Sequence, residues 1–289
     1  MDDAPARPWP APRAPDAAAE PAPTGIVIAA GRGLRLRPLT ETMPKCMLPV
    51  GGRPLLHHCL DGLAAVGCAE TVVIVGHHAE QIDAAGATIV QNVDFRDNNI
   101  LHSLMAAREH LNGPVVCSYS DILVEPTIHR RLMATPGDIV ISVDRDWRPY
   151  YANRRDHPPA EAENVLFDQA AAVRSIGKGL PAHENTSLTC GEFLGLWRMS
   201  AAGTRMFCDV FNEIDAKLKP AEPFQGAASW RKSYVTDLLQ ELVDRDIRVT
   251  CAVVERGWAE IDTVEDYERL PEIARQQRLW DVCGGGSVK

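Results

Sequence analysis

A glycine-rich loop with several basic side chains follows the first apolar run of the sequence. Gly31 and Gly33 come directly after this run, and two glycines at this spacing let backbone N–H groups approach a ligand closely. N–H groups in such a concavity bind phosphate oxygens, and nearby basic side chains add charge-assisted hydrogen bonds. Residues 31–53 hold five basic residues and one acidic residue, a net charge of +4. The loop therefore predicts a site for an anionic ligand.

This loop differs from two widespread phosphate-binding patterns. It lacks the Gly-x4-Gly-Lys-Ser/Thr spacing of the P-loop, and it lacks the third glycine of the dinucleotide-binding fingerprint. A Gly-x-Gly pair alone is a weak signal, because a tight turn beside a solubilising basic loop has the same composition. Both interpretations stay open on these residues alone.

Acidic residues far apart in the sequence are candidates for binding a divalent cation. Asp121 lies just beyond an expected strand, on the side of an open α/β sheet where ligands bind. Glu260 and Asp262 alternate along the chain, which places both on one face. Such carboxylates, together with the phosphate oxygens of a bound ligand, suit Mg²⁺. The alternatives are a turn residue for Asp121 and a helix N-cap for Asp262.

The elements that must position these residues alternate between strand-like and helix-like patterns. Short apolar runs predict strands, and apolar residues three and four apart predict helices between them. The expected strands are 25–29, 71–75, 87–91, 114–119, 138–143, 164–167, 172–176, 189–197 and 248–254. The expected helices are 54–66, 100–111, 201–217, 234–245 and 264–279. This order predicts an α/β fold with a Rossmann-like, mostly parallel sheet flanked by helices on both faces.

Composition excludes several classes of protein. The 289 residues carry a formal net charge of −9, which argues against a general nucleic-acid binder. We expect no membrane contact and a cytoplasmic location, because no apolar run is long enough to span a bilayer and no secretory signal pattern is present. The eight cysteines lack zinc-site spacing and are expected to be reduced.

The chain is expected to divide into three parts. Residues 1–24 contain seven prolines and eight alanines, which predicts a disordered leader. Residues 25–282 are expected to form one domain, and the glycine-rich residues 283–289 a flexible tail.

The loop and the residues after it resemble the signature of sugar-phosphate nucleotidylyltransferases and their cytidylyltransferase relatives. The matching residues are Gly31-x-Gly33-x-Arg35-Leu36-x-Pro38-Leu39-Thr40, Pro44-Lys45-x-x-Leu48-Pro49 and Gly52-x-Pro54-Leu55. The resemblance implies a fold of the nucleotide-diphospho-sugar transferase type and an NTP substrate. The loop residues that would hold the triphosphate are Ala30, Gly31, Gly33 and Leu34.

The same resemblance implies catalytic and base-binding roles. Arg35 would stabilise the leaving pyrophosphate, Lys45 the charge that develops on the α-phosphate, and Asp121 and Asp262 would bind the catalytic Mg²⁺. The segment Asn98-Asn99-x-x-x-Ser103-Leu104 is similar to phosphocholine and phosphonate cytidylyltransferases in particular. It implies that Ser103 contacts a pyrimidine base. The other expected neighbours of the base are Gly76 and Gln91.

Residues 145–157 are expected to form a small acceptor-binding insertion, with competing interpretations. One is an aromatic cage for a quaternary ammonium group, built from Trp147, Tyr150 and Tyr151. The second, favoured by the number of arginines, is a basic grip on a phosphonate, built from Arg148, Arg154, Arg155 and His157. The third is an insertion that packs on a dimer partner. The family match adds Lys178 as a contact to the acceptor phosphate, and the remaining acceptor candidates are Glu192 and Glu260.

The combined expectation is a Mg²⁺-dependent cytidylyltransferase. It would transfer CMP from CTP, or from another pyrimidine nucleotide, to a small phosphonate or phosphate acceptor and release pyrophosphate. Three alternatives stay open: a phosphocholine cytidylyltransferase, a sugar-1-phosphate nucleotidylyltransferase, and a non-catalytic nucleotide-binding regulatory protein. The expected partners are these two small molecules, with a homodimer left open.

Overall fold

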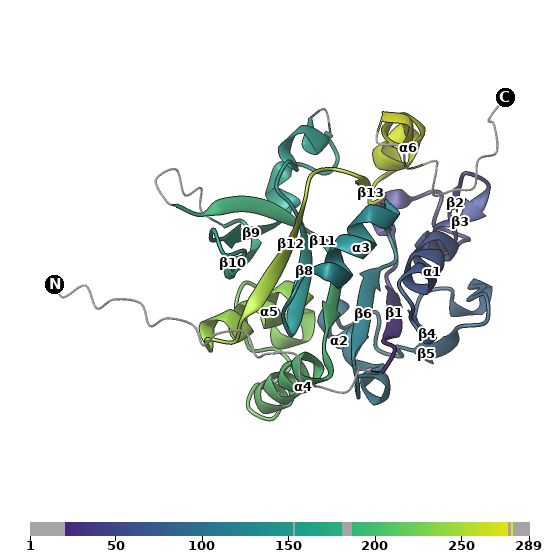
Figure 1. Ribbon diagram of the computed structural model, residues 1–289. Helices are drawn as coiled ribbons and strands as arrows, with labels where there is room; N and C mark the ends of the chain where they lie inside the picture. Colours follow the sequence, from purple (N-terminus) through teal and green to yellow (C-terminus); the bar gives the residue numbers. More distant parts are fainter. Residues whose placement is uncertain (1–20, 153, 181–186, 277–278, 280–289) are drawn as a thin grey trace.

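The computed structural model describes residues 21–152, 154–180, 187–276 and 279 (Figure 1). The strands of its main sheet are β1 (Thr24–Ala29), β4 (Glu70–Val75), β5 (Thr88–Gln91), β6 (Val115–Tyr119), β8 (Ile139–Asp144), β9 (Glu163–Phe167), β10 (Val173–Lys178), β11 (Thr189–Met199) and β12 (Val249–Val254). The helices are α1 (Leu55–Ala65), α2 (Ile100–Met105), α3 (Pro126–Ala134), α4 (Ala201–Asp215), α5 (Val235–Asp244) and α6 (Val264–Gln276). Two small sheets pair β2 (Pro49–Val50) with β3 (Arg53–Pro54) and β7 (Ile122–Val124) with β13 (Trp258–Glu260).

The main sheet is mostly parallel, as predicted. Its strand order is β10-β9-β11-β6-β1-β4-β5, with β8 pairing β11 and β12. Seven of the nine strands run in one direction, and β10 and β11 run in the other. The long strand β11 pairs with β9 over its first part and with β6 over its last part. It bends at Gly195, where φ is +73° and a Cβ atom would overlap the ring of Tyr119.

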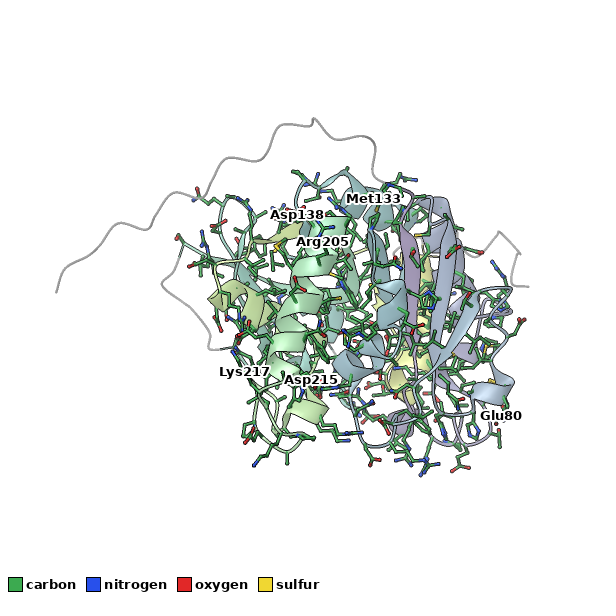
Figure 2. All side chains as sticks on the ribbon, turned by 90° about the horizontal axis from the view of Figure 1, so that it is seen from below. Glu80, Met133, Asp138, Arg205, Asp215 and Lys217 are labelled. Atoms are coloured by element: carbon green, nitrogen blue, oxygen red, sulfur yellow. The ribbon has the colours of Figure 1, made fainter. Side chains whose placement is uncertain are left out.

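Helices cover both faces of this sheet, because alternate residues of each buried strand point to opposite faces. On β1, Val27 and Ala29 pack into one cluster, which contains the apolar side chains of α1, α3 and α6. Ile26 and Ile28 pack into the other cluster, with α2, α4 and α5. The helix α4 lies along the outside of the second face, with Arg205 near its start and Asp215 at its end (Figure 2). Two apolar clusters therefore hold the sheet rigidly between layers.

Two helices differ from the sequence prediction. The helix expected over residues 100–111 ends as an α-helix at Met105, and a 3-10 turn follows at Arg108–His110. The helix α3 was not predicted, because it is only nine residues long and buries only Ile128, His129 and Leu132. So short an apolar pattern is indistinguishable from a loop by periodicity. Pro126, at its first turn, suits a helix start.

Two of the expectations concern membrane-spanning helices and the oxidation state of the cysteines. Within the described ranges, no helix is both long enough and apolar enough to cross a bilayer. The cysteines that lie in those ranges are free thiols, and most are buried. The predicted leader and tail lie almost entirely outside the described residues, and β1 begins at Thr24.

Candidate active site

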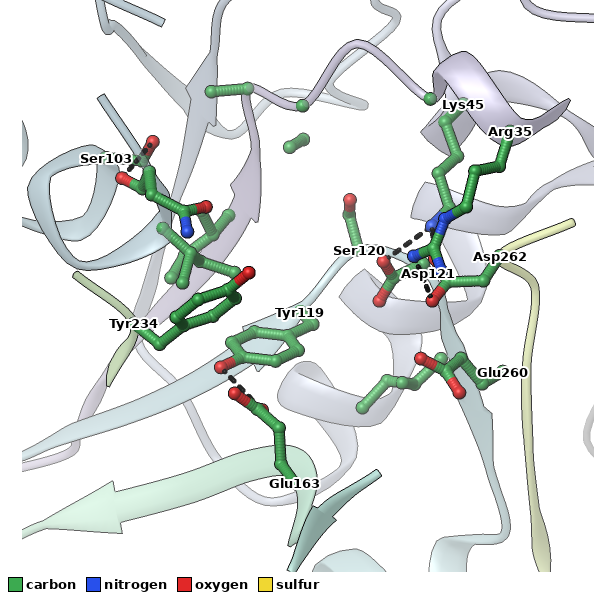
Figure 3. A pocket seen from close by; sticks show the side chains of 18 of the residues that line it. Arg35, Lys45, Ser103, Tyr119, Ser120, Asp121, Glu163, Tyr234, Glu260 and Asp262 are labelled. Carbon is green, nitrogen blue, oxygen red and sulfur yellow. Dashed lines mark hydrogen bonds and ion pairs between the residues drawn. The ribbon is translucent and has the colours of Figure 1, made fainter. Parts of the chain in front are cut away.

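A cavity of about 580 Å³ opens at the carboxyl ends of β1 and β6 (Figure 3). The glycine-rich loop after β1 and the residues Ser120 and Asp121 after β6 line it on one side. Other parts of its lining come from the start of α2, from strands β9, β10 and β11, and from the strand β13. Segments that are far apart in the sequence therefore meet where open α/β sheets bind their ligands.

The local structure of the loop directs Arg35 and Lys45 to the cavity. Gly33 has φ +58°, and a Cβ atom there would lie 3.1 Å from Lys45 Cβ and from Thr40 Cγ2. The Thr40 hydroxyl donates to the Gly33 carbonyl over 2.7 Å, which fixes this close approach. Leu36 is fully buried and anchors the short turn that carries Arg35. A larger side chain at Gly33 would separate the two segments that carry the basic residues.

The four charged residues predicted to be catalytic or metal-binding are brought together (Figure 3). The Lys45 ammonium donates to Asp121 Oδ2 over 2.7 Å and to Asp262 Oδ1 over 2.5 Å. Arg35 Nη2 donates to Asp262 Oδ2 over 2.8 Å. These residues come from positions as far apart as 35 and 262, so the fold, not local sequence, creates the cluster. Arg35 is about half exposed, with 49% of its side chain accessible, and can reach a ligand in the cavity.

The charges in this cluster stabilise one another. Burial lowers the pKa of Lys45, but Asp121 and Asp262 outweigh burial and raise this pKa above its ordinary value. Burial also raises the pKa of Asp262, and Lys45, His157 and Arg35 outweigh it, so that this pKa lies well below its ordinary value. Burial, with the charge of Asp262, raises the pKa of Glu260. The ammonium and the Asp262 carboxylate are therefore both charged at neutral pH.

The carboxylates have the properties of a cation site. Asp121 and Asp262 already bind one cation between them, the Lys45 ammonium. The other oxygen of Asp121, Oδ1, is buried and has no hydrogen-bond partner among the residues that the structure describes. His157, Glu260 and Asp262 form an adjoining group whose ligand-type atoms lie within 4.8 Å of one another. Oxygen-rich donors of this kind fit Mg²⁺.

The end of the cavity expected to hold the base is rich in amide and hydroxyl groups. Ser103 accepts a hydrogen bond from Asn92 Nδ2 over 2.9 Å, and Asn92 and Asn98 exchange two further hydrogen bonds. Asn98 is therefore not the helix N-cap that was its alternative interpretation, and Asn99 takes that position. The lining of the cavity includes the predicted nucleotide-binding residues Ala30, Gly31, Gly33, Leu34 and Ser103.

Two predicted neighbours of the base lie outside this lining. Gly76 packs behind the loop, where a Cβ atom would lie 2.7 Å from the Ala30 carbonyl oxygen and from Phe95 Cβ. The absence of a side chain at Gly76 therefore lets Ala30, which follows β1, and Phe95 lie close to the Gly76 backbone. Gln91 is exposed at the end of the edge strand β5. Phe95, whose backbone follows β5, lines the cavity instead.

The end of the cavity opposite the predicted base-binding residues contains one lysine and several carboxylates. The Lys178 ammonium lies 3.2 Å from Glu161 Oε2 and 4.9 Å from the centre of the Tyr234 ring. Glu163 accepts hydrogen bonds from Tyr119 and Thr236, and burial raises its pKa to about 7.

Glu192 is the most deeply buried carboxylate at this end of the cavity. Its Oε1 accepts a hydrogen bond from Tyr151. Its Oε2 is buried without a hydrogen-bond partner in the described part of the chain. Burial raises the pKa of this carboxyl group to about 8. This end of the cavity can therefore receive a cationic group.

Only part of the insertion at residues 145–157 reaches the cavity: Tyr151 and His157 line it, but the arginines of the predicted acceptor grip do not. Arg154 is buried, donates to both oxygens of Asp266 over 2.7 and 2.9 Å, and stacks on the rings of Tyr150 and Tyr151. The aromatic faces of the alternative cage thus hold the protein's own guanidinium. Tyr150 bonds to the backbone of Glu260, and Arg148 is exposed beside Trp147. Of the six acceptor candidates, Lys178, Glu192 and Glu260 line the cavity, and Arg148, Tyr150 and Arg154 do not.

Arg154 is expected to stabilise the fold. In the Arg154→Met variant, Asp266 stays buried without its guanidinium, and breaking a buried ion pair costs about 3–5 kcal/mol. We therefore expect a loss of that size in the free energy of unfolding, measured by urea denaturation. The exposed Arg155→Ala substitution serves as the control and should have little effect. A stable Arg154→Met variant with a greatly raised KM for the acceptor would instead make Arg154 an acceptor ligand.

Comparison with known proteins identifies the family. The model of the MobA-like NTP transferase domain matches residues 25–185, more than half of the chain. The chain belongs to this family. The predicted membership of the nucleotidyltransferases is thereby confirmed, and the glycine-rich loop and Asp121 both lie within the matched region.

The relatives of this NTP transferase include cytidylyltransferases. It is 32% identical over 282 residues to the CMP-5'-(3-aminopropyl)phosphonate synthase of Streptomyces rubellomurinus, a match that covers 90% of this chain and 41% of that protein. The chain thus spans less than half the length of this relative. It is 34% identical over 267 residues to the choline-phosphate cytidylyltransferase of Streptococcus pneumoniae, covering 87% of this chain and 98% of that one.

A solved structure shares the fold of this NTP transferase. The structure of CTP:phosphocholine cytidylyltransferase from Streptococcus pneumoniae superposes with a TM-score of 0.65 at 21% identity, and covers 87% of this chain and 99% of that chain. At this identity the similarity establishes the common architecture alone.

Several residues of the site were missed by sequence reasoning. Glu163 lies just before the predicted strand 164–167, and Tyr234 is the first residue of the predicted helix 234–245, so both looked like ordinary element ends. Tyr119 lies within a predicted strand, and nothing in its neighbours indicates that its hydroxyl reaches Glu163. The one available signal was an acidic residue close before an apolar run, Glu163 before residues 165–167.

Proposed function

We propose that this NTP transferase catalyses the Mg²⁺-dependent transfer of CMP from CTP to a small phosphonate or phosphate acceptor. The observation that carries the proposal is the convergence of Arg35 and Lys45 with Asp121 and Asp262 beside the glycine-rich loop. This arrangement supplies positive charge and a cation-binding pair of carboxylates at one edge of a cavity. Such a combination suits the transfer of a nucleotidyl group from a triphosphate.

The chemistry needs positioning and charge neutralisation more than proton transfer. An acceptor oxygen, already anionic near pH 7, forms a bond to the α-phosphorus, and the bond from this phosphorus to the β-phosphate oxygen breaks. Lys45 would stabilise the negative charge at the α-phosphate, and Arg35 that of the departing pyrophosphate. Mg²⁺ bound by Asp121 and Asp262 would supply further positive charge to the triphosphate. No general base is required for this step.

The opposite end of the cavity favours an acceptor that carries both an anionic group and an amino group. Lys178 lines the cavity and would contact the phosphonate or phosphate. Two buried carboxyl groups are suited to an ammonium group: Glu163, and Glu192, whose Oε2 has no hydrogen-bond partner among the described residues. The names of two relatives, an aminopropylphosphonate synthase and a choline-phosphate cytidylyltransferase, agree with such an acceptor.

The rates of pyrophosphate release with five nucleotides and four acceptors test the proposal. The nucleotides are CTP, UTP, dTTP, GTP and ATP, and the acceptors are 2-aminoethylphosphonate, ethylphosphonate, phosphocholine and glucose-1-phosphate. We expect the highest kcat/KM with CTP and 2-aminoethylphosphonate, and loss of the reaction when Mg²⁺ is chelated. A preference for glucose-1-phosphate would indicate a sugar-1-phosphate nucleotidylyltransferase. Nucleotide binding without pyrophosphate release would indicate a regulatory protein.

A further inference from the structure

The N-terminus of α2 is held by four consecutive carbonyl groups of a distant segment, residues 230–233. The backbone N–H of Asn99 donates to Arg231 over 3.1 Å and its side chain to Lys232 over 3.0 Å. The backbone N–H of Leu101 donates to Ser233 over 3.3 Å. The Nε2 atom of His102 donates to Trp230 over 2.8 Å. The first turn of α2 therefore rests on residues 230–233, which we call the brace.

The brace is itself anchored in the core. The Trp230 side chain is buried, and its indole N–H donates over 2.8 Å to Asp215, at the end of α4 in Figure 2. Trp230 also contacts the rings of His102, Phe211 and Phe224, with centroids 4.8 to 5.1 Å apart. Because these contacts are buried, the brace has a fixed position. Its hydrogen bonds to α2 therefore fix the position of the first turn of that helix.

The brace positions residues at the end of the cavity that is predicted to bind the base. Ser103 follows His102 directly, and its hydroxyl donates to the Asn99 carbonyl over 3.1 Å. Asn99 and Ser103 line the cavity, whereas the His102 ring faces Trp230 and Phe211 behind it. A shift of the first turn of α2 would therefore move Ser103 and Asn99 together relative to a bound nucleotide.

We propose that His102 is a positioning residue that determines nucleotide specificity by fixing α2 to the brace. The Trp230 carbonyl can only accept a hydrogen bond, so the His102 ring must carry its proton on Nε2. Burial lowers the pKa of His102, which keeps the ring neutral at pH 7. The inference rests on the proposed use of CTP, since it assigns His102 a role through Ser103 in reading the base.

Two substitutions at one position separate the hydrogen bond from packing. His102→Phe keeps an aromatic ring and removes the donor, whereas His102→Gln restores an N–H donor at a similar reach. Loss of one ordinary hydrogen bond corresponds to about a 3- to 10-fold change. We expect His102→Phe to raise the KM for CTP by that factor, to leave kcat nearly unchanged, and to lower the ratio of kcat/KM between CTP and UTP. His102→Gln should restore the KM for CTP and the ratio of kcat/KM between CTP and UTP.

The control is Arg108→Gln, which removes an exposed hydrogen bond from the end of the same region to Asn212 and should change none of these values. A His102→Phe enzyme with wild-type KM and specificity overturns the inference, and so does a His102→Gln enzyme that is impaired as much as His102→Phe. A wild-type enzyme that does not use CTP overturns the proposed function instead.

Hydrogen exchange on the wild-type protein tests the same inference without any substitution. In the presence of Mg²⁺ and a non-hydrolysable α,β-methylene analogue of CTP, we expect amides 99–103 and 230–233 to gain protection together. Protection of residues 99–103 alone would show that the brace does not respond to the nucleotide and would contradict the inference.

Discussion

The Lys45→Ala variant is expected to lose about 10²- to 10³-fold in kcat, the range seen when one preorganised donor to transition-state charge is removed. Lys45 is the only residue of the described cluster that contacts both Asp121 and Asp262, and the proposed reaction places it at the α-phosphate. The measurement is the steady-state rate of pyrophosphate release from CTP at saturating acceptor. Arg53→Ala is the matched control, because Arg53 lies in the same basic stretch and pairs with the exposed Asp61.

The same variant has a second expected property. Without the ammonium, Asp121 and Asp262 repel each other, so Lys45→Ala should unfold at a lower temperature than wild type in the presence of a chelator. Mg²⁺ should raise its melting temperature by more than it raises that of the wild type. Full activity of Lys45→Ala would reject the catalytic role, and an unchanged response to Mg²⁺ would reject the carboxylate pair as the metal site.

The Glu192→Gln variant is expected to lose activity selectively with acceptors that carry an amino group. A hydrogen bond to a charged group contributes about 1.5–3 kcal/mol, which corresponds to about a 10- to 100-fold loss in kcat/KM for 2-aminoethylphosphonate. Ethylphosphonate lacks the amino group, so its kcat/KM should change little and serves as the internal control. An equal loss with both acceptors would show that Glu192 shapes the site without binding the ammonium group.

The pH profile of this selectivity gives a second readout. Burial raises the pKa of Glu192 to about 8, so its carboxyl group is mostly neutral at pH 6.5 and ionised above pH 8. The preference for 2-aminoethylphosphonate over ethylphosphonate in kcat/KM should therefore rise between pH 6.5 and 8.5. Ionisation of the phosphonate affects both acceptors equally, so it does not change this ratio. In Glu192→Gln the ratio should not change with pH.

The sequence was sufficient to predict the sheet and the charged half of the site. The strands β1 and β6, which precede the glycine-rich loop and Asp121, are short and mostly apolar runs, and each long helix has apolar residues at helical spacing. Gly31 and Gly33 mark the loop, and Asp121 follows the expected strand at residues 114–119, so their positions at the carboxyl edge could be deduced. Asp262 follows β13, which was not predicted, so its position beside Asp121 came only from the family resemblance. Their direct contact through Lys45 is a consequence of the fold and could be expected only from the family resemblance.

The acceptor half could not be predicted in the same way. The spacing of residues in an irregular insertion does not determine which side chains face the cavity, and Arg154 turns instead to Asp266 on α6. Glu163 reaches the cavity because the bend at Gly195 lets β11 pair first with β9 and then with β6. A bend in one strand of this kind depends on tertiary contacts, here with Tyr119, and leaves no periodic signal.

Identifying the products of one reaction is the most direct test of the proposed transfer of CMP to a phosphonate. Wild-type protein, CTP, 2-aminoethylphosphonate and Mg²⁺ are incubated together and followed by phosphorus NMR. We expect pyrophosphate and a phosphonate–phosphate anhydride of CMP to appear in equal amounts while CTP is consumed. Unchanged CTP and phosphonate, under conditions in which the protein is folded and binds CTP, would contradict the proposed transfer.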